Sequence, residues 1–200
     1  MARGIWVAIV LVATGAALTA TWLIEPSRPT PATPSGPVAT PFGWTGHIAL
    51  VAGDGIAGLH DGASAQARFA DPYRVLRDRD GALYVSDAGD NNRIRRIGAD
   101  GSVSTFAGST QGFADGLGAA AAFDTPSGLA MDRNGNLYVA DTGNHAIRRI
   151  DPHGVVTTLA GDGTAGDRDG PGAQARFNGP IGVAVDATGA TRLTPLSVQT

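Results

Sequence analysis

The sequence predicts an all-β protein built from repeated small antiparallel sheets, and three observations predict it. Gly is abundant, with 29 residues, while Lys is absent and the only Glu is Glu25, so the charged residues that favour helices are almost missing. The stretch LYVSDAGDNNRIRRI (83–97) returns nearly unchanged as LYVADTGNHAIRRI (137–150). Short apolar runs alternate with tight turns on either side of both stretches. Together these features favour a repeated building block over a single catalytic motif.

A fixed spacing of 54 residues runs through the chain. The landmarks that share it are Phe69, Phe123 and Phe177, Pro72, Pro126 and Pro180, and Gly81, Gly135 and Gly189. An Asp-Gly pair recurs with the same spacing at 61–62, 115–116 and 169–170. Because the spacing agrees at many independent positions, we interpret these residues as structural positions of a repeat.

The segment 126–161 shows what one unit contains. Four apolar runs, at 127–132, 137–141, 146–151 and 155–161, are separated by the turns RNGN, TGNH and PHG. Such a pattern predicts four short strands in an antiparallel meander. Leu137 and Tyr138 point to opposite faces of their strand, so both faces of the sheet are apolar. A sheet of this kind needs a neighbour on each side, which the radially packed blades of a β-propeller provide.

The stretch GLAMDRNGNLYVADTGNHAIRRIDPHGVVTTLAG (128–161) resembles the NHL repeat, especially its long bacterial form. The loop 162–180 is similar to the insert of that form, and the resemblance covers roughly 46–189. It implies propeller blades, most often six in a ring. It also implies a binding or scaffold module that presents its loops to a protein or glycan partner, with a propeller-type hydrolase or lyase as the alternative.

The predicted blades do not add up to a closed ring. Residues 72–108 and 126–161 each predict a four-stranded blade, 46–53 matches the fourth strand of another, and 181–189 begins a third unit. After Gly189 the repeat breaks into a non-repeat tail (190–200), with Pro195 where an Asp is expected. Closed propellers have four to eight blades. Either the reading frame is truncated, which we favour, or several chains assemble one ring through uncovered blade faces.

Residues 1–25 predict a membrane segment. Residues 5–24 carry no charge, and about 20 such residues cross a bilayer core. The alternative is a cleaved signal peptide, for which ALTA (17–20) is a poor cleavage site. Residues 26–45 form a Pro-rich linker. We expect a membrane-anchored domain outside the cytoplasm, periplasmic or extracellular, with secretion after cleavage as the alternative.

The charged residues of the repeat invite a structural interpretation. Asp87 and Asp141 each end a strand before a turn, where we expect them to accept backbone N–H bonds from that turn. The third strands carry the recurring arginines Arg95, Arg96, Arg148 and Arg149. We expect these to form a solvated strand edge or rim that pairs with Asp. Residues 46–200 contain 13 Arg and 17 Asp, a balance that predicts no nucleic-acid partner.

Catalytic chemistry finds little support in the sequence. Related propeller folds include calcium-dependent lactonases that use a Glu ligand, but Glu25 lies beside the apolar segment. The chain has no Cys, no HxH or HExxH spacing and no GxSxG motif. Asp162, Asp167 and Asp169 are weak candidates for a calcium site, and no other cofactor is expected. We therefore favour a binding module over an enzyme and assign no catalytic residue.

Overall fold

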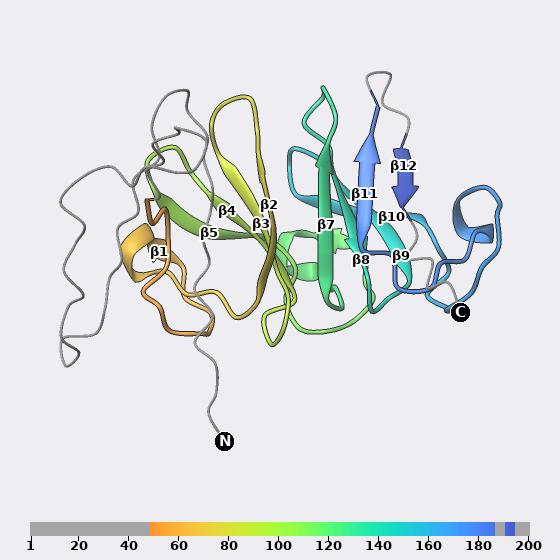
Figure 1. Cartoon of the computed structure of the whole chain (residues 1–200), viewed down its shortest axis with the longest axis horizontal. Coiled ribbons are helices and arrows are strands. Elements are labelled where there is room, and N and C mark those ends of the chain that lie inside the picture. Colours follow the sequence, from red (N-terminus) through yellow and green to blue (C-terminus); the bar gives the residue numbers. More distant parts are fainter. Residues whose placement is uncertain (1–48, 187–190, 195–200) are drawn as a thin grey trace, which may run out of the picture.

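The computed structural model describes residues 49–186 and 191–194, which form two five-stranded antiparallel sheets and a hairpin (Figure 1). The first sheet contains β1 (Gly62–Ala63), β2 (Pro72–Arg77), β3 (Leu83–Asp87), β4 (Arg93–Ile97) and β5 (Ser102–Ala107). The second contains β6 (Gly116–Leu117), β7 (Pro126–Met131), β8 (Leu137–Asp141), β9 (Ala146–Ile150) and β10 (Val155–Ala160). The hairpin pairs β11 (Gly182–Val185) with β12 (Thr191–Thr194). The expected membrane segment (1–25) and linker (26–45) lie outside the described residues, as does the tail except for 191–194.

The predicted all-β meander is confirmed, because neighbouring strands pair in the order β2, β3, β4, β5 and again β7, β8, β9, β10. The turn between β7 and β8 shows why. Asp132 Oδ1 accepts the backbone N–H groups of Asn134 and Asn136, at 2.8 and 2.9 Å. Gly135 then adopts a φ of +81°, and its counterpart Gly81 a φ of +93°, in the left-handed region that favours glycine.

Each sheet has one strand more than the four that the sequence predicts. The additional strands, β1 and β6, come from the insert that precedes each inner strand, and they pair with the outermost strands β5 and β10. In each insert a short 3-10 helix follows, namely η1 (Ser64–Gln66), η2 (Gly118–Ala120) and η3 (Gly172–Gln174). A two-residue strand of Gly and Ala or Leu carries no apolar alternation, so sequence patterning could not identify it.

The third unit continues further than the sequence predicts. The repeat consensus breaks after Gly189, yet β12 pairs with β11 in regular register, with Gly182 opposite Thr194 and Val185 opposite Thr191. Backbone pairing requires only N–H and C=O groups, so the hairpin persists although its side chains leave the consensus. Pro195 lies outside the described residues.

Residues 49–53, the described part of the predicted strand 46–53, form no strand. The backbone N–H of Gly53 instead donates to Ser64 O at 2.8 Å, and that of Asp54 donates to Ala67 O at 3.1 Å. Ala52 is buried against the first sheet together with Val51. The segment therefore packs on the first blade without a partner strand of its own in the described part of the chain.

The innermost strands β2, β7 and β11 lie side by side, and β7 occupies the middle position (Figure 1). Between the first two sheets lies a core that combines Phe123, Leu129 and Val139 of the second unit with Ile94 and Ala107 of the first. Burying both faces of a small sheet in this way is the arrangement of propeller blades.

Gly128 allows β7 to approach β11 closely. A Cβ atom built on Gly128 would lie 2.6 Å from the carbonyl oxygen of Ile181 and 3.0 Å from the Cα of Gly182. Backbone atoms cannot rotate away as a side chain can, so any larger residue must separate the two strands.

We expect Gly128→Ala to lower the free energy of unfolding by about 1–3 kcal/mol, the usual cost of overpacking a tight contact. Equilibrium urea unfolding measures the change. Gly112→Ala is the matched control, since the added Cβ would meet only the Cβ of Ala122, at 3.3 Å. Equal losses for the two variants would show that the β7–β11 approach is not the constraint.

Candidate functional site

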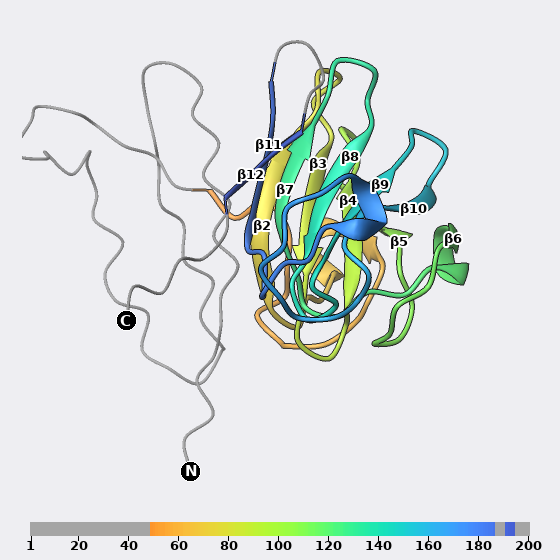
Figure 2. The ribbon, with the colours of Figure 1, turned by 90° about the vertical axis from the view of Figure 1, so that its right-hand side faces the viewer.

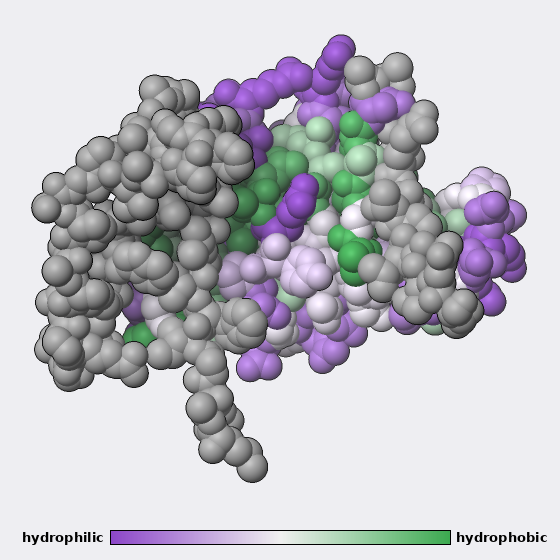
Figure 3. All heavy atoms as spheres, viewed as in Figure 1, coloured by the Kyte–Doolittle hydropathy of each residue, from purple (hydrophilic) through white to green (hydrophobic). Residues whose placement is uncertain are grey.

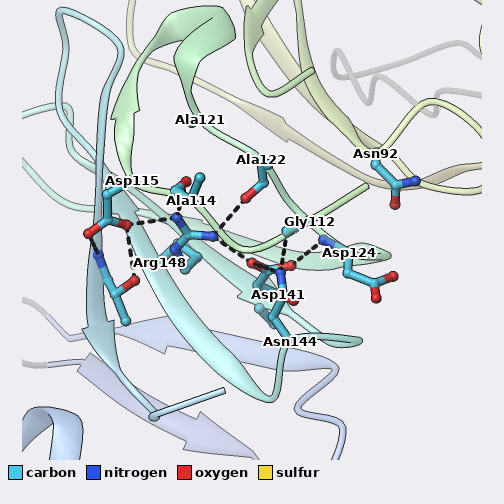
Figure 4. Close-up of polar contacts among 12 residues, drawn as sticks. Asn92, Gly112, Ala114, Asp115, Ala121, Ala122, Asp124, Asp141, Asn144 and Arg148 are labelled. Atoms are coloured by element: carbon cyan, nitrogen blue, oxygen red, sulfur yellow. Dashed lines mark hydrogen bonds and ion pairs between the residues drawn. The ribbon is translucent and has the colours of Figure 1, made fainter. Parts of the chain in front are cut away.

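Arg148, on β9, is the centre of a buried polar network in the second blade (Figure 4). One terminal nitrogen donates to Asp141 Oδ2 at 2.7 Å and to Ala122 O at 3.0 Å. The other donates to Asp115 Oδ1 at 2.7 Å and to Ala114 O at 2.6 Å. Asp141 ends β8, whereas Asp115 belongs to the insert. The guanidinium therefore joins the insert to the sheet.

Aromatic rings complete the surroundings of the Arg148 side chain, which is fully buried. The guanidinium carbon lies 5.0 Å from the centre of the Phe113 ring and 5.1 Å from that of Phe123. A buried guanidinium is costly unless it is paired and hydrogen-bonded, and here two carboxylates, two carbonyls and two ring faces supply that compensation. Arg148 Nε has no hydrogen-bond partner among the described residues.

The first blade repeats the network around Arg95. Its guanidinium pairs with Asp87 Oδ2 at 3.1 Å and with the Asp61 carboxylate, and it donates to Arg68 O at 2.8 Å and His60 O at 3.1 Å. Phe69 lies beneath it, with 5.0 Å between the guanidinium carbon and the ring centre. Phe69 and Phe123, Asp61 and Asp115, and Asp87 and Asp141 thus keep equivalent roles in the two units.

The arginine prediction is wrong about the exposure of Arg95 and Arg148 and right about their pairing with Asp. The sequence predicts a solvated rim for the four recurring arginines, but Arg95 and Arg148 are fully buried. Consecutive side chains of a strand point to opposite faces, so Arg149 points away from Arg148 and donates to Asn136 Oδ1 at 2.6 Å instead. The partner Asp115 lies 33 residues earlier, and no local pattern indicates such a contact.

The carboxylate of Asp141 accepts a backbone N–H, but not from the turn that follows it, whose Asn144 N–H donates to the Asp141 carbonyl oxygen at 3.1 Å. Its donor is the N–H of Asp124, at 2.8 Å and 17 residues earlier, and Asp87 likewise accepts from Ala70 and Asp71 at 2.9 and 3.1 Å. The following turn contributes a side chain, since Asn144 donates to Asp141 Oδ2 at 2.8 Å. Burial raises the pKa of Asp141 and of Asp87, against the opposing effect of these bonds.

Asp115 also protects the outer edge of the sheet. Its Oδ2 accepts the backbone N–H of Thr158 on β10, beyond the two residues that pair with β6, at 3.0 Å, and Oδ1 accepts the Thr158 hydroxyl at 3.0 Å. In the first blade Asp61 accepts the N–H of Thr105 in the same way. Figure 2 shows β6 and its insert on the outer side, away from β2, β7 and β11. The insert thus covers backbone groups that an exposed edge would offer to other strands.

The hydrogen bonds and the ion pair of Asp115 make the stability of the fold depend on pH in the acidic range. Partial burial opposes ionisation, but the Thr158 N–H, the Arg148 guanidinium and the Thr158 hydroxyl outweigh it and hold the pKa of Asp115 below its ordinary value of 3.8. A carboxyl whose pKa is lower in the folded state stabilises the fold above its unfolded pKa, and that stability is lost as pH falls through the folded pKa.

We therefore expect the loss of stability between about pH 5 and pH 2 to be smaller in Asp115→Asn than in the unmodified chain. Thermal melts across this range measure the slope. Asp167→Asn, in another insert, is the control and should leave the slope unchanged. A parallel loss in Asp115→Asn and the unmodified chain would assign the acid sensitivity to other carboxyls.

The inserts of the first and third units carry a second ion pair that the middle insert lacks. Arg68 Nε pairs with Asp54 at 2.7 Å, and Arg176 Nε with Asp162 at 2.8 Å. The middle insert is one residue shorter and has Ala122 at the arginine position. The Asp and the Arg are therefore absent together, a signal in the sequence that could have identified the pair.

The weak calcium candidates do not converge in the structure. Asp162 binds Arg176 and accepts the N–H of Thr164 at 2.9 Å, and Asp169 takes the repeat position of Asp61 and Asp115. Within residues 49–186, no three His, Asp or Glu side chains lie close enough together to hold a metal ion.

In the same part of the chain and in 191–194, no helix has the length and apolar character to cross a membrane.

Two equivalent turn residues connect successive units. Asn92 and His145 both have positive φ, 48° and 51°. Asn92 Oδ1 accepts the N–H of Thr125 at 2.7 Å, and His145 Nδ1 accepts that of Gly179 at 3.0 Å. Sequence patterning placed His145 in a turn but could not indicate this contact with Gly179, which lies 34 residues later in the next unit.

The remaining landmark residues also lie at structural positions. Pro72 and Pro126 begin the inner strands β2 and β7, and Pro180 precedes β11, where Thr142 Oγ1 donates to its carbonyl at 2.8 Å. Phe177 O accepts the N–H of Gly166 at 3.0 Å within the third insert. A proline at the start of an inner strand removes no bond from the sheet interior.

Comparison with known proteins agrees with this architecture. A family model described as the NHL repeat matches residues 123–150. The chain is 42% identical over 96 residues to Protein SUPPRESSOR OF QUENCHING 1, chloroplastic, from Arabidopsis thaliana. This match covers 47% of this chain and 9% of that protein. It is 38% identical over 102 residues to NHL repeat-containing protein 2 from Gallus gallus, covering 50% of this chain and 14% of the relative. The chain thus spans only a small part of these relatives.

Among solved structures, the chain is similar to a protein of unknown function from Bacteroides thetaiotaomicron VPI-5482. The two are 31% identical with a TM-score of 0.57, and the match covers 62% of this chain and 32% of that chain. The strand order and packing of the two described sheets are those of propeller blades.

Proposed function

This chain is an NHL-repeat protein, and from that premise we propose that it is an exported, membrane-anchored binding module whose propeller loops contact a protein or glycan partner. One observation carries the proposal. The polar residues that recur in each unit, represented by Arg148, Asp141 and Asp115, bind one another and the backbone inside the fold. These residues hold the inserts in place, so the exposed side chains of the inserts are the groups that would recognise a partner.

Apolar side chains are exposed on two inserts that these networks fix. In the first insert Ile56 is 54% exposed and Leu59 44% exposed, and in the second Phe113 is 44% and Leu117 61% exposed. Exposed apolar side chains on ordered loops favour a contact surface, because the loop loses little conformational entropy on binding.

Site-specific photo-crosslinking tests this function. A benzophenone side chain replaces Ile56 or Leu117 in the full chain, which is then expressed and irradiated in its native cells. We expect an adduct with a protein or a glycan from the insert positions. The matched control is Asn134, which is exposed in the hairpin between β7 and β8 and should give none.

Two outcomes would contradict the binding function. Adducts of equal yield from Asn134 would indicate non-specific contact. Lactone hydrolysis by the purified full chain that requires calcium and stops with a chelator would favour the hydrolase or lyase alternative.

Membrane anchoring is tested separately. Residues 5–24 supply the uncharged segment for which the anchor is proposed. We expect the full chain to stay in the membrane fraction after an alkaline carbonate wash, and the chain lacking residues 1–25 to be released. Full-length material recovered in the wash, or a mature N-terminus beyond residue 17, would favour the secreted form.

A further inference from the structure

The chain contains two Asn-Gly pairs, at 134–135 and 178–179, and their surroundings differ. In such a pair the backbone nitrogen of the glycine can attack the side-chain amide of the asparagine, because no Cβ on the glycine hinders the approach. Asn134 and Asn178 are both exposed, and neither side chain forms a hydrogen bond within the described part of the chain. The surroundings of the glycine nitrogen therefore distinguish the two pairs.

The nitrogen of Gly179 lies beside a base. Its N–H donates to His145 Nδ1 at 3.0 Å, so Nδ1 carries no proton and directs its lone pair at the N–H bond that must break. An imidazole nitrogen can take up that proton. The N–H of Gly135 donates instead to the backbone carbonyl of Asp132, at 3.3 Å, and a carbonyl oxygen is too weak a base to remove it. Of the two pairs, only 178–179 has its reacting N–H on a proton acceptor.

The repeat makes the same junction elsewhere without a base. Asn92 takes the place of His145 in the first blade, also with a positive φ, and its Oδ1 accepts the N–H of Thr125 at 2.7 Å. An amide oxygen thus forms the structural contact but cannot act as a general base. Histidine at position 145 therefore adds proton acceptance to a contact that does not require it.

Water, the second reactant for a change at Asn178, reaches this part of the molecule. The neighbouring insert residues Asp167, Arg168 and Asp169 are exposed, as is Asn178 itself. Figure 3 shows mainly hydrophilic residues over the third insert, at the right of the view. An intermediate formed at this position can therefore be hydrolysed by solvent, without a further group from the protein.

We propose that Asn178 is a self-modification site, at which His145 is the general base and the side-chain amide is converted to a carboxylate. The Gly179 nitrogen attacks Cγ of Asn178, and a new C–N bond forms as its proton passes to His145 Nδ1. The imidazolium returns the proton to the side-chain nitrogen, the original C–N bond breaks, and ammonia leaves a cyclic imide. Water then opens the imide at one of its two carbonyls, which gives aspartate or isoaspartate at position 178.

This modification changes the junction between the second and third units. The imide has no N–H at Gly179, so His145 loses its donor. Isoaspartate adds one carbon to the main chain immediately before Gly179, one residue from the Pro180 carbonyl that accepts the Thr142 hydroxyl at 2.8 Å. Both products also add a negative charge at an exposed position. The site is independent of the partner that the inserts bind.

Peptide mapping by mass spectrometry tests the proposal. The full chain is purified in detergent, incubated at neutral pH and digested at intervals, and the exchange of the amide NH2 for OH is followed at Asn178 and Asn134. We expect Asn178 to react faster than Asn134 in the folded protein. In urea, where His145 is no longer held beside Gly179, the two should react at similar rates. A ratio of the two rates that urea leaves unchanged would overturn the proposal.

The variant His145→Asn separates the base from the contact. It places at the junction the residue that already forms it at Asn92, and asparagine tolerates the positive φ. We expect it to slow the conversion of Asn178 by about tenfold or more, because a positioned general base contributes this much or more. The rate at Asn134 and the urea midpoint should stay unchanged. Equal rates at Asn178 in this variant and the unmodified chain, or no conversion there, would show that the contact is structural only.

Discussion

Replacing Arg148 with methionine is expected to lower the free energy of unfolding by about 3–5 kcal/mol, the cost of breaking a buried ion pair by removing one partner. The substitution keeps much of the side-chain volume but leaves Asp141, which is fully buried, without its guanidinium. It also leaves the carbonyls of Ala114 and Ala122 without this donor and releases Asp115. The insert should detach from the second blade as a consequence.

Equilibrium urea unfolding measures this loss. The Thr158 N–H donates to Asp115, so the rate of its hydrogen exchange reports detachment of the insert. Arg149→Met is the matched control, because it removes a neighbouring, partly exposed arginine that donates to Asn136 and interacts with Tyr138 but pairs with no buried carboxylate among the described residues. It should cost less than about 1 kcal/mol, as expected for one net hydrogen bond.

A double variant separates the buried charge from packing. If the uncompensated carboxylate of Asp141 causes the loss, adding Asp141→Asn to Arg148→Met should recover part of the stability. No recovery, together with an equal loss in Arg149→Met, would show that the network contributes through volume and not through charge.

Local sequence patterns predicted the sheets but not what holds the inserts to them. Gly135 and the residues around it identify a hairpin because the turn needs only neighbouring residues. The bonds from Arg148 to the insert join residues 26 to 34 positions apart, and no periodicity of 2 or 3.6 residues indicates them. The strand β6 was missed because its two residues carry no apolar alternation and its partner strand β10 lies far along the chain.

The repeat itself contained the missing signal. Asp61 and Asp115 keep their distance from Arg95 and Arg148 to within one residue, which indicates a partnership that a single unit cannot reveal. Residues that contact a partner cannot be identified from the repeat in this way, because exposed residues such as Ile56 and Leu117 are not constrained by packing. The ligand they contact is therefore not encoded in any spacing that the fold requires.

The second large effect is expected at Phe123, and its repeat equivalent Phe69 supplies the comparison. Phe123 is fully buried between two blades, against Ile94 and Ala107 of the preceding unit, and a Cβ built on Gly108 would lie 2.9 Å from its ring. Phe123→Ala should cost about 3–5 kcal/mol, because the blades on both sides cannot collapse into the cavity.

Phe69→Ala should cost less at low protein concentration, because a Cβ on Gly53, the counterpart of Gly108, would meet nothing within 4 Å. Phe69 is buried in the core cluster of its own blade, and the open space beside Gly53 gives its surroundings room to relax. Urea unfolding of both variants in dilute solution measures the difference, and equal losses would contradict the claim that a preceding blade determines it.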